Sequence, residues 1–184
     1  MNIPRSKLTL ARAGLLLGAF MVIARINGAT FSATTDFVPS KDPVFSPYYR
    51  ETNASLPTEH GVAIDTLKHR AQPAAAELVF AGPTGSYDVT LIAVAEEDGE
   101  SSYRFIIDGQ DQGVRQNPPQ SAKRTPVPHR WAGVTLKTGG TIQVVFAGHT
   151  NEKIPEGAGT AWSRGRWRSL TVTASPAAKA KDSP

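Results

Sequence analysis

The sequence contains no cysteine among its 184 residues. This absence excludes disulfide frameworks, zinc sites built from cysteines, iron–sulfur clusters and catalysis by a thiol. A membrane-spanning run is missing too: the uncharged apolar run Ala13–Ala24 has 12 residues, whereas a transmembrane helix needs about 20. No Gly-x-Ser-x-Gly, phosphate-binding loop or dinucleotide-binding fingerprint occurs, so the common motif-bearing enzyme classes are not indicated.

Acidic residues are absent from the first part of the chain. The sequence has 20 Lys and Arg against 16 Asp and Glu, but Arg5, Lys7, Arg12 and Arg25 all precede the first acid, Asp36. Without these four residues the charges balance. A neutral body argues against general nucleic-acid binding, which requires several phosphates to be neutralised at once.

The basic start, the short apolar run and the small residues at 28–29 and 32–33 are typical of an export signal. We therefore predict that residues 1–33 are a signal peptide and that the mature protein begins between Thr30 and Thr34. The mature protein is expected to be secreted or to reside in the periplasm or cell envelope, without a stable membrane span. An uncleaved N-terminal anchor is the alternative.

Composition divides the rest of the chain into three parts. Residues 34–58 are rich in proline and aromatic residues, which predicts an extended lead-in rather than a helix or a central strand. Residues 59–174 carry the strand patterns and form the predicted domain. Residues 175–184 contain no large apolar side chain and predict a flexible tail.

Strand patterns dominate the predicted domain, with Gly- and Pro-rich turns between them. Asp108-Gly109 predicts a tight reversal, because an Asp-Gly pair tolerates positive φ. The spacing predicts an all-β, single-domain antiparallel β-sandwich. The expected strands are Ala76–Phe80, Tyr87–Glu96, Ser102–Ile107, Gln112–Arg115, Gly133–Lys137, Thr141–Ala147 and Arg166–Thr173.

The stretch from Glu77 to Gly109 resembles the galactose-binding-like jelly-roll domains, which include many carbohydrate-binding modules of bacteria. The likeness rests on an apolar strand, then Gly85-Ser86-Tyr87-Asp88-Val89, then a strand that ends in Asp108-Gly109. It resumes at 133–140 and in the final strand pattern. The resemblance implies a jelly-roll fold and recognition of carbohydrate, although these residues mostly form turns and core.

The same family commonly holds a structural calcium ion between carboxylates of an early strand and an acid near the end of the last strand. Here residues 165–173 contain no Asp or Glu, and the early region offers only Glu51, Glu59 and Asp65. This departure argues against the calcium site, and we expect no cofactor.

The region from Thr150 to Trp167 combines a Gly-rich loop with Trp162, Arg164 and Arg166. Strand alternation places these three side chains on one face. Sugar recognition needs such a pairing, because an indole stacks on the apolar face of a pyranose while guanidinium groups bind its hydroxyls or carboxylates. In the alternative, the tryptophans close the end of the sandwich and the arginines pair with Glu96, Glu97 or Glu100.

Residues 112–151 lack acids and accumulate basic residues, so an acidic glycan could bind in this region. Equally, the segment forms an ordered surface loop with Trp131 beneath it. The crowded acids at 96–100 indicate a calcium- or hydroxyl-binding loop, or simply a solvated turn. The predicted ligand-binding residues are Trp131, Trp162, Arg164, Arg166, Asn151 and Glu97.

We predict an exported, non-catalytic carbohydrate-binding sandwich that acts on a surface glycan or beside a separate enzyme. The alternative is a structural or adhesive cell-envelope protein that binds other proteins. A small hydrolase would need two carboxylates, for example Glu97 and Glu152, that face each other across about 5–9.5 Å.

Overall fold

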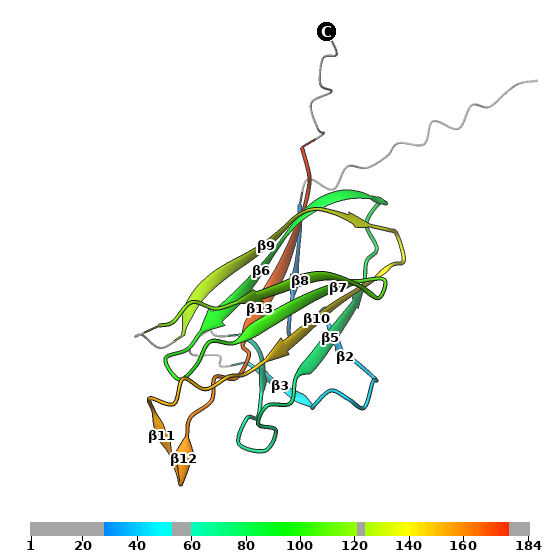
Figure 1. Cartoon of the computed structure of the whole chain (residues 1–184). Helices are drawn as coiled ribbons and strands as arrows, with labels where there is room; N and C mark the ends of the chain where they lie inside the picture. Colours follow the sequence, from blue (N-terminus) through cyan, green and yellow to red (C-terminus); the bar gives the residue numbers. More distant parts are fainter. Residues whose placement is uncertain (1–27, 53–59, 121–123, 177–184) are drawn as a thin grey trace, which may run out of the picture.

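The computed structural model describes residues 28–52, 60–120 and 124–176 (Figure 1). The strands are β1 (Ala29–Ser32), β2 (Val38–Pro39), β3 (Tyr48–Glu51), β4 (Gly61–Ile64), β5 (Ala74–Val79), β6 (Gly85–Ala95), β7 (Ser102–Ile107), β8 (Gln110–Gln116), β9 (Thr125–Leu136), β10 (Thr141–Ala147), β11 (Pro155–Glu156), β12 (Gly159–Thr160) and β13 (Trp167–Ala174). The first sheet has the strand order β3-β4-β13-β6-β9, with β1 also paired to β13, and the second has the order β2-β5-β10-β7-β8. Every pairing is antiparallel. The predicted all-β sandwich is confirmed.

The core lies between the two sheets and follows from alternation along the strands. In β6, Val89 and Leu91 are fully buried while Asp88 and Thr90, which point to the other face, are half-buried. Buried side chains of both sheets form one apolar cluster. Each large apolar side chain that leaves water in this way contributes about 1.5–3 kcal/mol to folding.

The turn between β7 and β8 has the predicted geometry. Asp108 and Gly109 adopt φ values of 48° and 77°, and Ile107 pairs directly with Gln110. Positive φ at both central residues matches the twist of the flanking strands. An Asp108 oxygen also accepts a hydrogen bond from the Thr141 amide at 2.8 Å. The hairpin is therefore tied to the neighbouring strand β10.

Residues of the predicted lead-in are part of the sandwich. Strand β2 pairs with β5 in the second sheet, and β3 pairs with β4 in the first. Phe37, between β2 and β1, is fully buried and meets Trp167 edge-on at a ring distance of 4.9 Å. Strands from the predicted lead-in and from the predicted domain thus share the same two sheets. Proline-rich segments are compatible with short edge strands, because an edge leaves backbone positions without a partner.

The chain ends predicted as signal and tail fall mostly on residues 1–27 and 177–184, outside the described residues. Residues 29–32, however, form β1 against the middle of β13. Ser175 is anchored through its amide to Ser86 and through its hydroxyl to Asp88. The described residues contain no helix that is long and apolar enough to cross a membrane.

Gly148 offers a direct test of how closely two segments approach at the end of the sandwich. A Cβ atom at this position would lie 1.9 Å from the Ser163 carbonyl oxygen. We expect Gly148→Ala to lower the free energy of unfolding by about 1–3 kcal/mol or more, because the backbone must move apart. Gly28→Ala is the control, since its nearest neighbours would be 3.8 Å away. Urea unfolding that gives both variants the same midpoint would contradict this packing.

Candidate functional site

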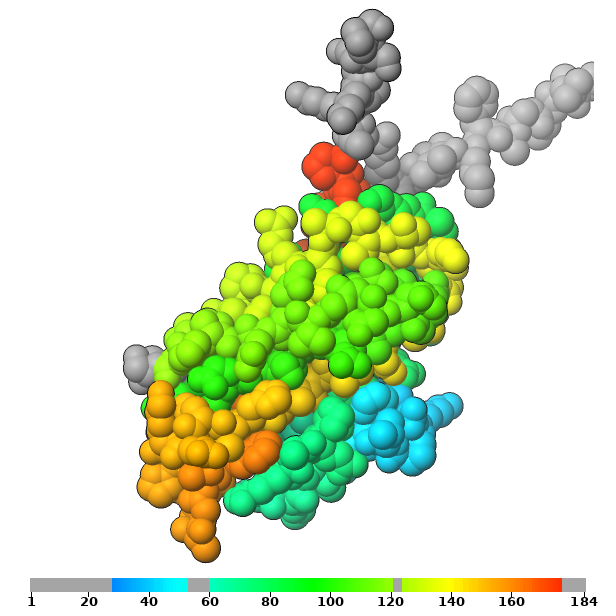
Figure 2. Space-filling model, viewed as in Figure 1, coloured from blue at the N-terminus to red at the C-terminus, as the bar shows by residue number. Residues whose placement is uncertain are grey.

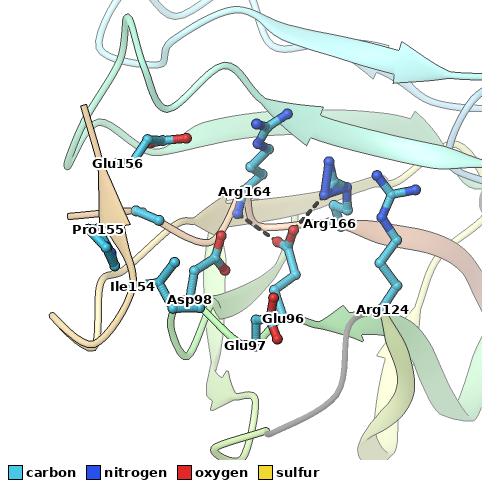
Figure 3. A pocket seen from close by; sticks show the side chains of 10 residues that line it. Glu96, Glu97, Asp98, Arg124, Ile154, Pro155, Glu156, Arg164 and Arg166 are labelled. Carbon is cyan, nitrogen blue, oxygen red and sulfur yellow. Dashed lines mark hydrogen bonds and ion pairs between the residues drawn. The ribbon is translucent and has the colours of Figure 1, made fainter.

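A cavity of about 310 Å³ opens at one end of the sandwich (Figure 3). It lies next to the β11–β12 hairpin, which projects as the orange part of the surface in Figure 2. Four segments form it: the turn after β6, the residue before β9, the β11–β12 hairpin with the residue before it, and the chain that leads from this hairpin into β13. Arg124, just before β9, lies on the side opposite the hairpin (Figure 3). The lining residues are Glu96, Glu97, Asp98, Arg124, Ile154, Pro155, Glu156, Ala161, Arg164 and Arg166.

The hairpin wall is built by a glycine turn. Glu156 pairs with Gly159, so Gly157 and Ala158 form a two-residue connection, and Gly157 has φ of 61°. Glycine adopts this φ without strain. Ile154 and Pro155 come from this hairpin and give the cavity an apolar side, while the groups in its centre are charged (Figure 3).

Arg166 is a buried charge in the cavity lining that connects several strands. It is 5% exposed, and its guanidinium meets both oxygens of Glu51 at 2.8 and 2.9 Å. A third contact runs to Glu96 on the other side. Paired geometry of this kind satisfies a buried guanidinium well. The arginine therefore joins β3, the end of β6 and the start of β13.

Glu96 links this ion network to the cavity. Its second carboxylate oxygen accepts a hydrogen bond from the Arg164 backbone amide at 2.7 Å. Burial raises the pKa of Glu96 above its ordinary value, and the neighbouring Arg166 charge opposes this rise. The Arg164 side chain is half-buried and donates to the Tyr49 hydroxyl at 3.1 Å. The backbone and side chain of Arg164 are thus both fixed.

Asp98 lies beside this network in the cavity lining. It occupies the tight turn closed by the Glu96–Gly99 bridge. Its Oδ1 atom is buried and has no hydrogen-bond partner among the described residues. Burial raises the pKa of Asp98, whereas Arg166 and Arg164 lower it.

The chain after β10 holds the acidic turn in place. A Cβ on Gly99 would lie 1.9 Å from the His149 carbonyl oxygen, so the turn rests directly on the chain after β10. Asn151 donates from its side-chain amide to the Glu97 carbonyl at 2.8 Å, and its backbone amide donates to the Asp98 carbonyl at 3.1 Å. These contacts fix the backbone of the two acids that enter the cavity.

The structure brings together three of the predicted ligand-binding residues. Glu97, Arg164 and Arg166 all line the cavity. Arg166 is buried there and is already paired with Glu51 and Glu96. The alternative interpretation, in which the arginines pair with acids of the turn, included the contact with Glu96 but not the one with Glu51. Asn151 contacts the acidic turn, where its side-chain amide donates a hydrogen bond to the Glu97 carbonyl.

The two predicted tryptophans are not in the lining. Trp131 is 3% exposed, packs on Phe105 at a ring distance of 4.9 Å and carries Arg115 over its ring at 5.5 Å. Its position beneath β8 leaves no ring face for stacking. Trp162 is half-buried and directly follows Ala161, which does line the cavity. The carbonyl of Trp162 accepts a bond from the Thr66 hydroxyl at 3.4 Å.

Sequence reasoning missed Asp98 and Glu156 as lining residues, and Glu51 as the partner of Arg166. The sequence shows the acidic turn at residues 96–100. It does not show which acids of this turn enter a cavity. Nothing in the sequence indicated that Glu51 would return to β13, since 115 positions separate the partners.

Among the described residues, no three His, Asp or Glu side chains are arranged to hold a metal ion. Glu152, named as one half of a hydrolase pair, is exposed and lies outside the cavity lining. What the site offers is hydrogen bonding: carboxylate acceptors and guanidinium donors beside a small apolar wall. That combination is suited to binding a polar ligand with apolar patches.

The solved structures that resemble this chain have a known architecture. The CBM36-1 domain of a multidomain xylanase from the hindgut metagenome of Trinervitermes trinervoides matches with a TM-score of 0.52 and 17% identity, over 82% of this chain and 99% of that domain. The chain has the galactose-binding-like jelly-roll fold. The GH26-CBM35 β-(1,4)-mannanase of Podospora anserina matches this jelly-roll domain with a TM-score of 0.50 and 17% identity, over 87% of this chain and 30% of the enzyme. The predicted resemblance is confirmed at the level of fold.

Sequence comparison adds one curated relative and no family model. The uncharacterized protein P23 of Formosa agariphila is 31% identical over 97 residues, which make up 50% of this chain and 21% of P23. The jelly-roll domain thus spans about a fifth of the length of that relative. No family model matches.

Replacement of Arg166 tests the ion network. We expect Arg166→Met to lower the free energy of unfolding by about 3–5 kcal/mol at neutral pH, because the buried carboxylate of Glu96 and the partly buried carboxylate of Glu51 lose their counter-charge. The loss should shrink as the pH falls, because burial raises the pKa of Glu96 and protonation of this carboxylate removes the charge that lacks a partner in the variant. Urea unfolding at several pH values measures both effects.

Arg130→Met is the matched control, because the Arg130 side chain is 69% exposed and lies 3.9 Å from Asp88. This variant should change stability by no more than about 0.5 kcal/mol. If the two substitutions have equal cost, or if the Arg166→Met penalty grows in acid, the network does not have the role given to it here.

Proposed function

We propose that the protein is an exported, non-catalytic carbohydrate-binding module whose ligand site is the cavity at the β11–β12 end. The observation that carries the proposal is a cavity of about 310 Å³ lined by fixed carboxylates and guanidiniums, on a jelly-roll fold shared with the CBM36-1 domain of a xylanase. Volumes of this order accommodate one or two sugar rings.

The chemistry of the lining supports a sugar ligand. Carboxylates accept hydrogen bonds from hydroxyls, and the guanidinium of Arg164 donates to them. Ile154, Pro155 and Ala161 supply apolar surface for the C–H face of a ring. Trp162 lies next to Ala161 in the chain and is the remaining candidate for aromatic stacking. Glu97 is a further proposed ligand-binding residue. Arg166 and Asn151 hold the ligand-binding residues in position.

An acidic glycan is less favoured than the sequence suggested. Four of the lining residues are acids and three are arginines, one of which is Arg166 with its carboxylate partners Glu51 and Glu96. An anionic substituent would meet the acids of the lining, among them Glu97, Asp98 and Glu156. The basic residues of β8 and β9 lie along the strands rather than in the cavity lining.

Protein adhesion has weaker support. The exposed large apolar side chains of the described residues are Val38, Val44, Leu67, Val79 and Val114. Val38 and Val114 come from β2 and β8, at opposite edges of the second sheet. A docking surface for another protein is normally one contiguous apolar patch.

Affinity electrophoresis through gels that contain xylan, mannan, galactan or chitosan tests the proposal. We expect retardation by at least one of these polysaccharides, and Arg164→Ala should weaken it about tenfold or more, since a charged hydrogen bond contributes about 1.5–3 kcal/mol. Arg130→Ala is the control and should migrate like the parent chain. Retardation by none of a broad panel of glycans, with the fold intact, overturns the proposal.

A further inference from the structure

A chain of buried polar groups crosses the core from β9 to the start of β13. Asn117 follows β8 and is 2% exposed, and His129 on β9 is 7% exposed. The Nε2 atom of His129 lies 2.9 Å from Asn117 Oδ1, and Asn117 Nδ2 donates to the Val94 carbonyl at 3.1 Å. The same Nδ2 atom donates to the Tyr103 hydroxyl at 3.4 Å, and this hydroxyl donates to the Arg166 carbonyl at 2.6 Å. His129 is thereby linked to the backbone of a residue that lines the cavity.

These contacts decide which nitrogen of the imidazole carries the proton. Asn117 uses its amide nitrogen as a donor to Val94, so its oxygen faces His129 as an acceptor. The donor must then be the Nε2–H group of His129, which the neutral ring supplies. Burial lowers the pKa of His129 below its ordinary value, and the charge of Arg115 lowers it further. At neutral pH the folded chain therefore holds this ring uncharged.

The described groups that face His129 offer no countercharge to an imidazolium. Leu91 is its partner on β6, the ring centroid of Tyr103 on β7 lies 5.3 Å from that of the imidazole, and Arg115 on β8 is itself a cation. Burial and the nearby Glu96 raise the pKa of the Tyr103 hydroxyl, so this group stays protonated. In the described part of the chain, no ion pair joins His129 to an acid. A second proton on the ring thus places an uncompensated cation in the core, which is costly.

The seam between β8 and β9 is the place where contact with water can relieve this cost. Here the edges of the two sheets meet, and among the described strands no backbone ladder joins them. Two side chains bridge the seam at 3.3 Å each: the indole of Trp131 donates to the Gly113 carbonyl, and Arg115 donates to a carbonyl of β9. Both bonds are longer than the usual N–H···O distance of about 2.9–3.0 Å. Separation of β8 from β9 would bring water to His129.

We propose that His129 is an acid-operated switch: its protonation favours separation of β8 from β9 and so loosens the support of the cavity at Arg166. The closed form is preferred while the ring is neutral. The open form, in which water solvates the imidazolium, gains population as the pH falls. The effect on ligand binding rests on the proposed function, whereas the switch itself is a property of the fold and is measured without a ligand.

Titration of the ring tests the switch in the unmodified chain. Proton NMR resolves the four histidines, and the signal that is absent from His129→Gln identifies His129. Its titration midpoint should lie below the ordinary value of about 6.5. A midpoint at or above that value overturns the proposal.

Urea unfolding between about pH 5 and 8 measures the linked loss of stability. The unfolded chain binds the proton at about pH 6.5 and the folded chain only at lower pH, so stability falls as the pH drops through this value. Relative to His129→Gln, the unfolding constant of the parent chain should rise by up to about tenfold per pH unit. This comparison cancels the titration of the acids, which both proteins share.

Glutamine suits the comparison because it keeps an N–H donor for Asn117 and does not titrate. His69→Gln, which replaces a half-buried histidine after β4, is the matched control and should keep the pH profile of the parent chain. If the parent and His129→Gln have the same profile, the switch is ruled out.

Amide hydrogen exchange locates the opening. After correction for the intrinsic rate, protection of β8 should fall by up to about tenfold between about pH 7.5 and 5.5, whereas β10, in the middle of the same sheet, should change little. His129→Gln should lose this response. An equal loss of protection in both strands would mean global unfolding and would overturn the proposed local opening.

The switch and the proposed function fail separately. Where a polysaccharide retards the chain in a gel, retardation should weaken from about pH 7.5 to 5.5 in the parent chain and less so in His129→Gln. Equal weakening in the two overturns the link to the cavity. If no glycan binds at either pH, the proposed function fails, while the titration, unfolding and exchange measurements still decide the switch.

Discussion

A buried arginine between two glutamates governs the geometry of this end of the sandwich. Isolated charges are costly inside a protein, so Arg166 is stable there only while Glu51 and Glu96 keep their positions. Because these partners belong to different strands, the ion network fixes β3, β6 and β13 relative to one another. Any conformation that opens one contact leaves charge without compensation, which makes the arrangement stiff.

The stiffness extends from the ion network to the cavity through backbone contacts. Glu96 holds the Arg164 amide, and Asn151 holds the turn that presents Glu97 and Asp98. The residues most deeply buried are thus positioning residues, and the groups available to a ligand are their neighbours in the chain. A rigid set of donors and acceptors lowers the entropy that ligand binding must overcome.

Local patterns determined which parts of this fold could be predicted. Ser102–Ile107 and Thr141–Ala147 were expected with the bounds that β7 and β10 have, because their side chains alternate cleanly. The first half of β9 was expected as a loop, since it contains Pro126 and Pro128. It is an edge strand of the described sheet and pairs there with β6, and proline is tolerated at such an edge. Short β1, β2 and β3 carry too few residues for a period to show.

The site was harder to predict than the fold because its residues meet only in three dimensions. Both Arg164 and Arg166 line the cavity, but not through strand alternation, because residues 161–166 form no strand and Gly165 has a φ of 61°. The sequence also could not show that Arg166 would be enclosed by Glu51. Trp131 is of a residue type that often binds sugars, but it is buried in the core. Aromatic and basic side chains are used for both purposes, and only burial distinguishes them. The distribution of buried charge, rather than the presence of tryptophan, therefore identifies the region of this domain that can bind a ligand.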